Sequence, residues 1–518
     1  MVDGGDVDLV ADIGMPDRFT IYTSYITFML SLTWAFAAIP AMIPAYIAPT
    51  SLTNPNGTEI MPEFYSVIKE FKLDPGSAEL ATTVYFIGSL VLGQIPCALS
   101  DKYGRHPILF LSALTTGLSG IFAALAPTYP LFLVGRFFQG AAFTATTNVN
   151  WVMVCESVPL SKHGLASFVF GLMYSPSPSP PLPPSRWVCG YCIISPLAIL
   201  FPTWRLLFMV TSVPMLLYSF VARSTIRESL AYLILRKRRR EVDEWISHME
   251  SWGQVKFEGG CLDQLLAEDN ESDSPSNGSY SPSSEVVHED SPLLPRTSPP
   301  HRSSQGALEP SPSIWAMTKD AVSDSTTALH LAISIYMWIT DFLVYNGLSL
   351  SSTGLNVGNP HVNYVFSGLV EVPATILLPI MMDKWGRRPT VIFTHALTSI
   401  TLFAMCFISE EAGSIYTIVW LVAKFGTASS FIALYIYGSE IFHVKYRNIC
   451  LGICCTLGNL GAIAAPYSGR AASNRPWVIF LTYASVSGVS SILDIFLPET
   501  LHKKHGRDRR IAPEDFAE

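Results

Sequence analysis

The chain has 518 residues, of which 49% are hydrophobic and 14% charged, and its mean hydropathy is +0.34. This composition excludes an ordinary soluble globular protein, in which about a quarter of the residues are charged. The formal net charge of −8 argues against a nucleic-acid partner. The nine cysteines lie mostly in apolar runs and indicate no disulfide framework.

Apolar blocks of about 20 residues recur along the chain, and each is long enough to cross a bilayer as a helix. Backbone groups in lipid must be bonded within the segment, so these blocks are predicted to be helical. The twelve predicted spans cover residues 20–46, 78–98, 108–126, 131–153, 164–201 with an interruption, 205–222, 328–350, 362–382, 390–409, 414–437, 448–467 and 476–496.

Lysine and arginine gather in alternate loops, and this pattern sets the orientation. The loops with Arg105, Lys162, Arg387 and Lys445 are basic, whereas those after spans three, seven and nine hold neither residue type. The N-terminus, 1–18, and the tail, 498–518, are therefore expected in the cytoplasm. The loop at 47–77 is then extracellular, and its Asn56 stands in an Asn-Gly-Thr glycosylation sequon.

The fifth span is interrupted by a proline-rich insert at 175–186, with the sequence SPSPSPPLPPSR. Such a coil would leave backbone carbonyls unpaired against lipid. Either the insert bulges out of the bundle or it reflects a faulty gene model or splice variant. We favour the second account, because removing about 12 residues leaves one span of ordinary length.

The long loop at 223–325 separates a first bundle of six spans, 19–222, from a second, 326–497. It opens with a basic, helix-like stretch and then becomes rich in serine, proline and glutamate, which predicts disorder. Glu289 with Leu293 and Leu294 fits the acidic dileucine pattern of vesicle sorting, although such short matches also arise by accident.

One short loop pattern occurs twice, about 280 residues apart, as Asp101–Arg105 and Asp383–Arg387. Its recurrence at the same place in each half indicates a duplicated transporter bundle. Asp101 and Arg105, and likewise Asp383 and Arg387, are predicted to pair and to face the other half, with a contact that forms when the cytoplasmic side closes and breaks when it opens.

Further short motifs accompany this repeat, and none is specific alone. They are Gly135-Arg136, Glu156, Trp204-Arg205, Arg227-Glu228-Ser229, Tyr345-Asn346-Gly347-Leu348, Gly368–Pro373, Gly438-Ser439-Glu440, Arg447-Asn448 and Leu497-Pro498-Glu499-Thr500. Together they resemble the major facilitator superfamily, and within it the organic cation, anion and zwitterion transporters (solute carrier family 22). The resemblance implies an all-helical membrane fold of two pseudo-symmetric six-helix bundles that carries solutes by alternating access.

The chain departs from these transporters in three places. The extracellular loop is short and has no cysteine, and the loop at Arg227 is a degraded form of the family's Pro-Glu-Ser-Pro-Arg motif. In span eleven, related cation carriers place an aspartate and many anion and carnitine carriers an arginine. This chain has Asn459 there. The charge of its substrate therefore does not follow from the resemblance.

Charged residues inside spans are costly and usually face a cavity, so each is a candidate site. The second half has Asp341, Glu371 and Lys424, which together leave one negative charge and a weak preference for cations. The resemblance also implies that Glu371 lies at the substrate pocket. The alternative is a structural pair in which Glu371 and Lys424 neutralise each other and bind nothing.

Aromatic faces also hold organic cations. Trp151 lies five residues before Glu156, where related carriers have an aromatic residue in the pocket. Trp338 and Tyr345 are seven residues apart and share one helical face. Packing is the alternative for all three.

The sequence thus predicts a carrier of small organic ions, with cations weakly favoured and anions or zwitterions such as carnitine as alternatives. A sugar carrier or a vesicle membrane protein of the synaptic-vesicle type are competing interpretations. No nucleotide-binding loop, nucleophile–base pair or metal-ligand cluster is visible, so we expect no enzyme, cofactor or metal. A monomer in the plasma membrane is expected, with a vesicle membrane as the alternative.

Overall fold

The structure is a computed structural model that describes residues 21–49, 59, 61–157, 186–236, 238–252, 323–355, 358–442, 444–471 and 477–501. Several predictions fall outside these residues and stay predictions. They concern Asn56, Glu289, Leu293, Leu294, residues 1–18 and the insert at 175–186 except its last residue, which begins a described helix.

The first half contains six membrane helices, two of which break into consecutive segments. In chain order they are α2 (Ile21–Met42) with α3 (Pro44–Ile47), α5 (Pro75–Leu92) with α6 (Gln94–Tyr103), α7 (Arg105–Leu125), α8 (Tyr129–Cys155), α10 (Arg186–Leu200) and α11 (Trp204–Thr225). The first break lies at Ile43, directly before Pro44, whose nitrogen lacks the hydrogen that would bond the carbonyl oxygen of Pro40 in a continuous helix.

The second half repeats this arrangement. Its helices are α16 (Ser325–Ser351) with η2 (Ser352–Gly354), α17 (Pro360–Leu369) with α18 (Glu371–Trp385), α19 (Arg387–Met405), α20 (Ser414–Ile441), α21 (Val444–Ala471) and α22 (Trp477–Leu493) with η4 (Asp494–Phe496). A one-turn helix, η3 (Glu410–Ala412), precedes α20.

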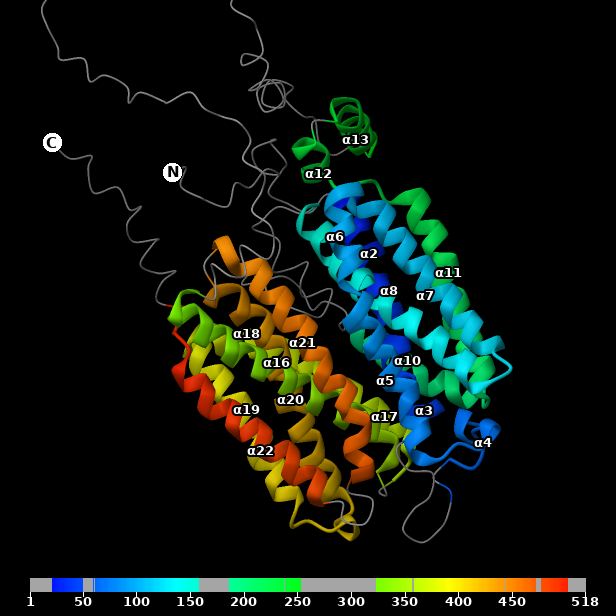
Figure 1. The fold of residues 1–518 in the computed structure, drawn as a ribbon, viewed down its shortest axis with the longest axis vertical. Helices are drawn as coiled ribbons and strands as arrows, with labels where there is room; N and C mark the ends of the chain where they lie inside the picture. The colour runs from blue at the N-terminus through cyan, green and yellow to red at the C-terminus, as the bar shows by residue number, and fades with distance from the viewer. Residues whose placement is uncertain are drawn as a thin grey trace, which may run out of the picture.

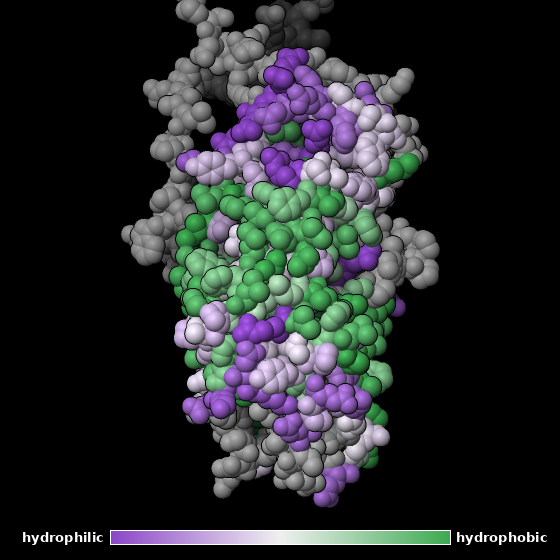
Figure 2. All heavy atoms as spheres, turned by 90° about the vertical axis from the view of Figure 1, so that its right-hand side faces the viewer, coloured by the Kyte–Doolittle hydropathy of each residue, from purple (hydrophilic) through white to green (hydrophobic). Residues whose placement is uncertain are grey.

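Within the described ranges, nine helical spans are long and apolar enough to cross a membrane. Three further helices, α8, α10 and α19, bring the number to twelve. They are not among the nine because α8 and α19 carry more polar residues and α10 is shorter. Figure 2 shows the resulting apolar belt between two polar ends on the face of the first half. The predicted all-helical fold of two bundles is confirmed (Figure 1).

Helices inside each half approach closely at glycines. A Cβ on Gly140 of α8 would overlap the carbonyl oxygen of Tyr85 on α5, and a Cβ on Gly461 of α21 would overlap that of Ile339 on α16. Small residues allow such backbone contact between membrane helices, where dispersion forces rather than water hold helices together. Each half is therefore packed as a unit.

The two halves join at the end that bears α3 and α17, which the charge pattern assigns to the outside. Tyr364 of α17 stacks on Tyr191 of α10 with ring centroids 4.6 Å apart and meets Tyr46 of α3 edge-on at 4.9 Å. Its hydroxyl donates to the carbonyl oxygen of Met42 at 3.3 Å. This aromatic contact closes the outer end.

At the cytoplasmic end the halves lean apart (Figure 1). There Arg105 makes its hydrogen bonds and ion pairs within the first half, and Arg387 makes its own within the second. This arrangement, joined at the outer end and separated at the inner end, faces inward.

Two short helices of the central loop, α12 (Leu230–Leu235) and α13 (Arg239–Ser251), cover the cytoplasmic end of the first half. The hydroxyl of Tyr232 donates to the carbonyl oxygen of Lys102 at 3.0 Å, and the ring of Trp245 meets that of Tyr22 edge-on at 5.7 Å. On the outer side, the short helix α4 (Val67–Phe71) carries Glu70, which binds Arg205.

Candidate functional site

A cavity of about 150 Å³ lies between the two halves and is lined by residues of both. The first half contributes Trp34, Ala41, Met42, Phe86, Ser89, Phe143, Thr144, Thr147, Asn148, Trp151 and Trp187. The second contributes Phe342, Tyr345, Asn346, Glu371, Thr375, Ala428, Phe431, Ile432, Tyr435, Cys455 and Asn459. Among the described residues of this lining, Glu371 is the one that carries a charge.

Glu371 opens α18 and is 5% exposed. Its Oε1 accepts a hydrogen bond from the hydroxyl of Tyr345 at 2.8 Å and lies 3.3 Å from Nζ of Lys424. In the described part of the chain, no hydrogen bond is made to Oε2. Half of the carboxylate is thus held in place, and the other half remains an anionic acceptor at the cavity.

Lys424 lies behind this carboxylate and is fully buried. Its Nζ donates to Oγ of Ser349 at 2.5 Å and sits 3.6 Å from the ring centroid of Tyr345. The predicted Glu371–Lys424 pair therefore exists, and Lys424 occupies one face of the Tyr345 ring. Because the ammonium does not line the cavity, it compensates Glu371 without offering a cation to an incoming solute.

Aromatic rings surround the carboxylate from both halves. Nε1 of Trp187 donates to the Tyr345 hydroxyl at 2.9 Å, and Trp187 meets Trp34 edge-on at 6.0 Å. Phe431 stacks on Tyr345 at 5.1 Å. Lys424 and Phe431 thus both pack on the Tyr345 ring, whose hydroxyl orients Glu371.

Of the seven predicted substrate-binding residues, Trp151, Tyr345, Glu371 and Asn459 line the cavity. Their role in binding stays a prediction, as does that of the other three, which lie behind the lining. These are Lys424, Trp338, which packs edge-on against Tyr435 at 4.8 Å, and Asp341, which bonds His395 of α19.

Asp341 and Trp338 do not line this cavity, and the packing of their helix explains why. Helix α16 is buried around most of its circumference, because it packs against α20, α21 and α22 as well as the cavity. Sharing a helical face with Tyr345 therefore does not establish what that face contacts.

Sequence reasoning also missed two ionisable residues, His395 and Asp494, although both lie inside predicted spans. The cost of burying such groups in a bilayer was the available signal. It missed Trp187 and Phe431 as well, for which a single sequence offers no signal beyond aromatic character.

The duplicated loop motif forms two matching clusters at the cytoplasmic ends. Arg105 binds Asp101 at 3.2 Å and Glu156 at 3.1 Å. In the second half, Arg387 binds Asp383 at 2.6 Å and Glu440 at 3.2 Å. Both predicted pairs are present. The aspartates lie on the last helical turn rather than in a loop, since α6 ends at Tyr103 and α18 at Trp385.

The glycine after each of these helices makes the turn at positive φ, 113° for Gly104 and 105° for Gly386. Only glycine adopts such angles readily. A Cβ there would also crowd a carboxylate that follows the last helix of each half, Glu228 at Gly104 and Glu499 at Gly386.

These two carboxylates accept the free backbone N–H groups at the start of the next helix. Glu228 accepts from Arg105 at 2.9 Å, and Glu499 accepts from Arg387 at 2.9 Å. Burial raises the pKa of Glu228 against the opposing effect of its N–H donors. Burial acts in the same direction on Glu499, but there the N–H donors prevail and lower the pKa.

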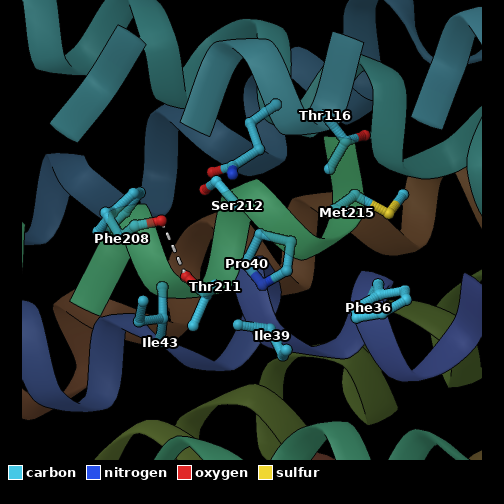
Figure 3. A pocket seen from close by; sticks show the side chains of 10 residues that line it. Phe36, Ile39, Pro40, Ile43, Thr116, Phe208, Thr211, Ser212 and Met215 are labelled. Carbon is cyan, nitrogen blue, oxygen red and sulfur yellow. Dashed lines mark hydrogen bonds between the residues drawn. The ribbon is translucent and has the colours of Figure 1, made fainter. Parts of the chain in front are cut away.

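A second, much smaller cavity of about 10 Å³ lies inside the first half, between α2, α7, α8 and α11 (Figure 3). The labelled side chains around it include Phe36, Ile39 and Met215, and the dashed line joins Thr211 to the carbonyl oxygen of Phe208. A space of this size holds about one water molecule. It is a packing gap and offers no room for an organic solute.

Known proteins resemble this chain in sequence and in fold. Residues 19–259 match the model of the Major Facilitator Superfamily. A Caenorhabditis elegans protein named as a transporter is 27% identical over 476 residues, which cover 91% of this chain and 84% of that protein. An Arabidopsis thaliana organic cation/carnitine transporter is 26% identical over 448 residues, 85% of this chain and 75% of that protein.

Among solved structures, the inward-open xylose transporter of E. coli superposes with a TM-score of 0.65. The alignment covers 94% of this chain and 99% of the other at 15% identity. At that identity the likeness establishes the fold, which is the twelve-helix major facilitator fold.

Proposed function

We propose that this chain, a membrane transporter with a Major Facilitator Superfamily domain and fold, carries small organic cations by alternating access. The main support is the composition of the central cavity. It combines one carboxylate, Glu371, with many aromatic rings, and its described lining residues include neither lysine nor arginine. A carboxylate and aromatic faces are the two groups that attract an organic ammonium in a site of low dielectric constant.

The nearby Lys424 does not reverse this preference. It is fully buried behind Tyr345 and already pairs with Glu371, so an anionic solute would meet the carboxylate before the ammonium. The relatives named for organic cations, carnitine and organic anions keep these substrate classes in the test. The amides of Asn148, Asn346 and Asn459 favour a sugar as the second candidate, because neutral amides suit hydroxyl groups.

The inward-facing state is one end of the proposed cycle. To reach the other end, the aromatic contact between Tyr191 and Tyr364 must open and the cytoplasmic ends must close. Glu371 and Trp187 come from opposite halves and both line the cavity. When the halves rock about this cavity, a solute bound between them is exposed first to one side of the membrane and then to the other.

The test is uptake of tetraethylammonium, an organic anion, carnitine and a sugar by cells expressing the chain. We expect saturable uptake of tetraethylammonium and a loss of about tenfold or more in Glu371→Gln, since one charge-assisted contact is worth ~1.5–3 kcal/mol. Glu371→Asp, which keeps the charge, should retain more uptake, and surface biotinylation controls for expression. Unaffected tetraethylammonium uptake in Glu371→Gln contradicts the cation site.

We further propose that the protein works in the plasma membrane. Imaging of a tagged full-length chain tests this. Punctate staining would favour the vesicle alternative, which the dileucine pattern at Leu293 and Leu294 suggests.

A further inference from the structure

A second group of ionisable residues is buried in the C-terminal half, away from the cavity. His395 of α19 lies between two carboxylates, with Nδ1 2.7 Å from Oδ2 of Asp494 and Nε2 3.2 Å from Oδ1 of Asp341. The exposed fractions are 1% for His395, 2% for Asp341 and 0% for Asp494. This triad ties α16, α19 and the short helix η4 together.

The geometry fixes how many protons the triad holds. A neutral imidazole carries one N–H, yet both ring nitrogens of His395 face a carboxylate oxygen. With both aspartates ionised, a neutral ring would point a lone pair at one of them. The triad therefore holds an added proton, either as an imidazolium or as a carboxylic acid that donates to the ring.

With that proton the triad still carries one negative charge in an apolar interior. The second oxygens, Oδ2 of Asp341 and Oδ1 of Asp494, are buried and have no hydrogen-bond partner among the described residues. Each is a place for a further proton, which would neutralise the cluster. No group of three His, Cys, Asp or Glu suited to a metal ion occurs in the described part of the chain.

Among the residues that the structure describes, the surrounding helices supply no other charge that compensates the triad. From α20, the hydroxyl of Ser430 donates to Oδ1 of Asp341 at 2.9 Å. Lys424 on the same helix is committed to Glu371, and Asp383 on α18 to Arg387. The phenol of Tyr437 on α20 donates to the carbonyl oxygen of Pro498, just after η4.

Tyr483 of α22 bonds Ser468 of α21. The other ionisable groups close to the triad are the glutamates of the cytoplasmic cluster, Glu440 on α20 and Glu499 after η4, which bind Arg387 and the start of α19.

The triad connects the cavity to the cytoplasmic cluster. Asp341 is one turn from Tyr345, which lines the cavity, and Ser430 precedes the cavity residue Phe431. At the other side, Asp494 is five residues before Glu499, and Thr500 donates to Glu440 at 2.6 Å. A change of charge at His395 is thus felt by the helices that hold both sites.

We propose that Asp341, His395 and Asp494 form a proton-binding site whose occupancy sets how tightly α16 is held against α19 and η4. Buried Asp/His chains in transporters commonly relay or store protons, and three groups this close titrate as one unit. The proposal rests on the proposed function only in using transport as one readout. It makes the exchange rate depend on pH through a group that no solute touches.

The first experiment measures tetraethylammonium exchange in proteoliposomes with the full-length chain and equal pH on both sides. This probe carries a permanent charge, so its own form does not change with pH. As the pH falls we expect the wild-type rate to change severalfold and the His395→Gln profile to be flat.

The second experiment requires neither a solute nor a variant of His395. Infrared difference spectra of the purified wild-type protein should show a protonated carboxylic acid that appears as the pH falls. Asp341→Asn and Asp494→Asn should each alter this band, and Glu371→Gln should leave that component in place.

The outcomes separate the two proposals. No exchange at any pH together with the infrared band overturns the cation-carrier proposal and supports the proton site. Exchange with identical pH profiles in the wild type and His395→Gln, or an infrared band that both aspartate variants leave unchanged, overturns the proton site.

Discussion

Arg105 and Arg387 occupy equivalent places in the two halves, and each binds an aspartate one turn earlier and a glutamate at the end of the next membrane helix. The interiors of the halves differ. In the first half, Arg136 is fully buried and bonds the carbonyl oxygens of Ala81 and Pro40 and the side chain of Gln139.

The second half instead buries ionisable groups that contact one another, Glu371 with Lys424, and Asp341 with His395 and Asp494. This comparison shows that duplication has kept the cytoplasmic clusters in both halves while the interior charges have diverged. Under the proposed function, closing the inner end falls to both halves, whereas recognition of charge falls to the second.

The largest expected effect is on the interior pair. Lys424→Met leaves Glu371 without its cation, and breaking a buried pair in this way costs ~3 kcal/mol or more. We expect a markedly lower unfolding temperature in detergent, measured by tryptophan fluorescence. The double variant Lys424→Met/Glu371→Gln should recover most of the loss, because it leaves no uncompensated charge.

The matched control in the other half is Arg136→Met, for which Glu371→Gln should give no recovery. Additive losses in Lys424→Met/Glu371→Gln would show that the two residues do not depend on each other and would weaken the contrast between the halves.

A smaller effect is expected at the cytoplasmic clusters. Asp101→Asn should reduce tetraethylammonium uptake while surface expression stays largely intact. Asp383→Asn should reduce it more, by about fivefold against about twofold, since the Asp383 bond is shorter and less exposed, at 43% against 75%. Parallel loss of expression and uptake in both variants would instead indicate a role in folding.

The smallest effect concerns Glu228 and Glu499, whose pKa values shift in opposite directions. Because the pKa of Glu228 is raised in the folded protein, its carboxylate binds a proton more readily there than in the unfolded chain. Its cap therefore loses stability as the pH rises above 4.5. The lowered pKa of Glu499 means that its cap is stable above 4.5 and weakens as pH falls below it.

Amide hydrogen exchange measures this difference. On acidification below about pH 4.5, protection at Arg387 and Arg388 should fall relative to protection at Arg105 and His106. An equal response of the two helix starts would contradict the assigned shifts.

The sequence predicted the fold because its signals are local and strong. Span length and the repeat at Asp101 and Asp383 depend on nearest neighbours and on hydropathy, and the helices occur where these place them. The site was predictable in part, since the expense of a buried charge identifies Glu371 and Lys424 without a structure.

The remaining site features depend on the angle at which one helix meets another. Nothing local distinguishes Asp341, which turns toward His395, from Tyr345 one turn later, which reaches the cavity. The bond from Trp187 to Tyr345 joins residues 158 positions apart, across an interface that changes during transport. Contacts of this kind follow only from the assembled bundle.

The close approach of α8 to α5 at Gly140, and of α21 to α16 at Gly461, has a mechanical consequence. The carbonyl oxygens of one helix already contact the glycine of the other, so the two helices of each pair cannot slide past each other. Strain imposed by a solute is then not absorbed within one half but is transmitted to the interface between the two halves. An alanine at either glycine should therefore push the two helices apart. This change should alter the rotation of a whole bundle from a position that no solute contacts.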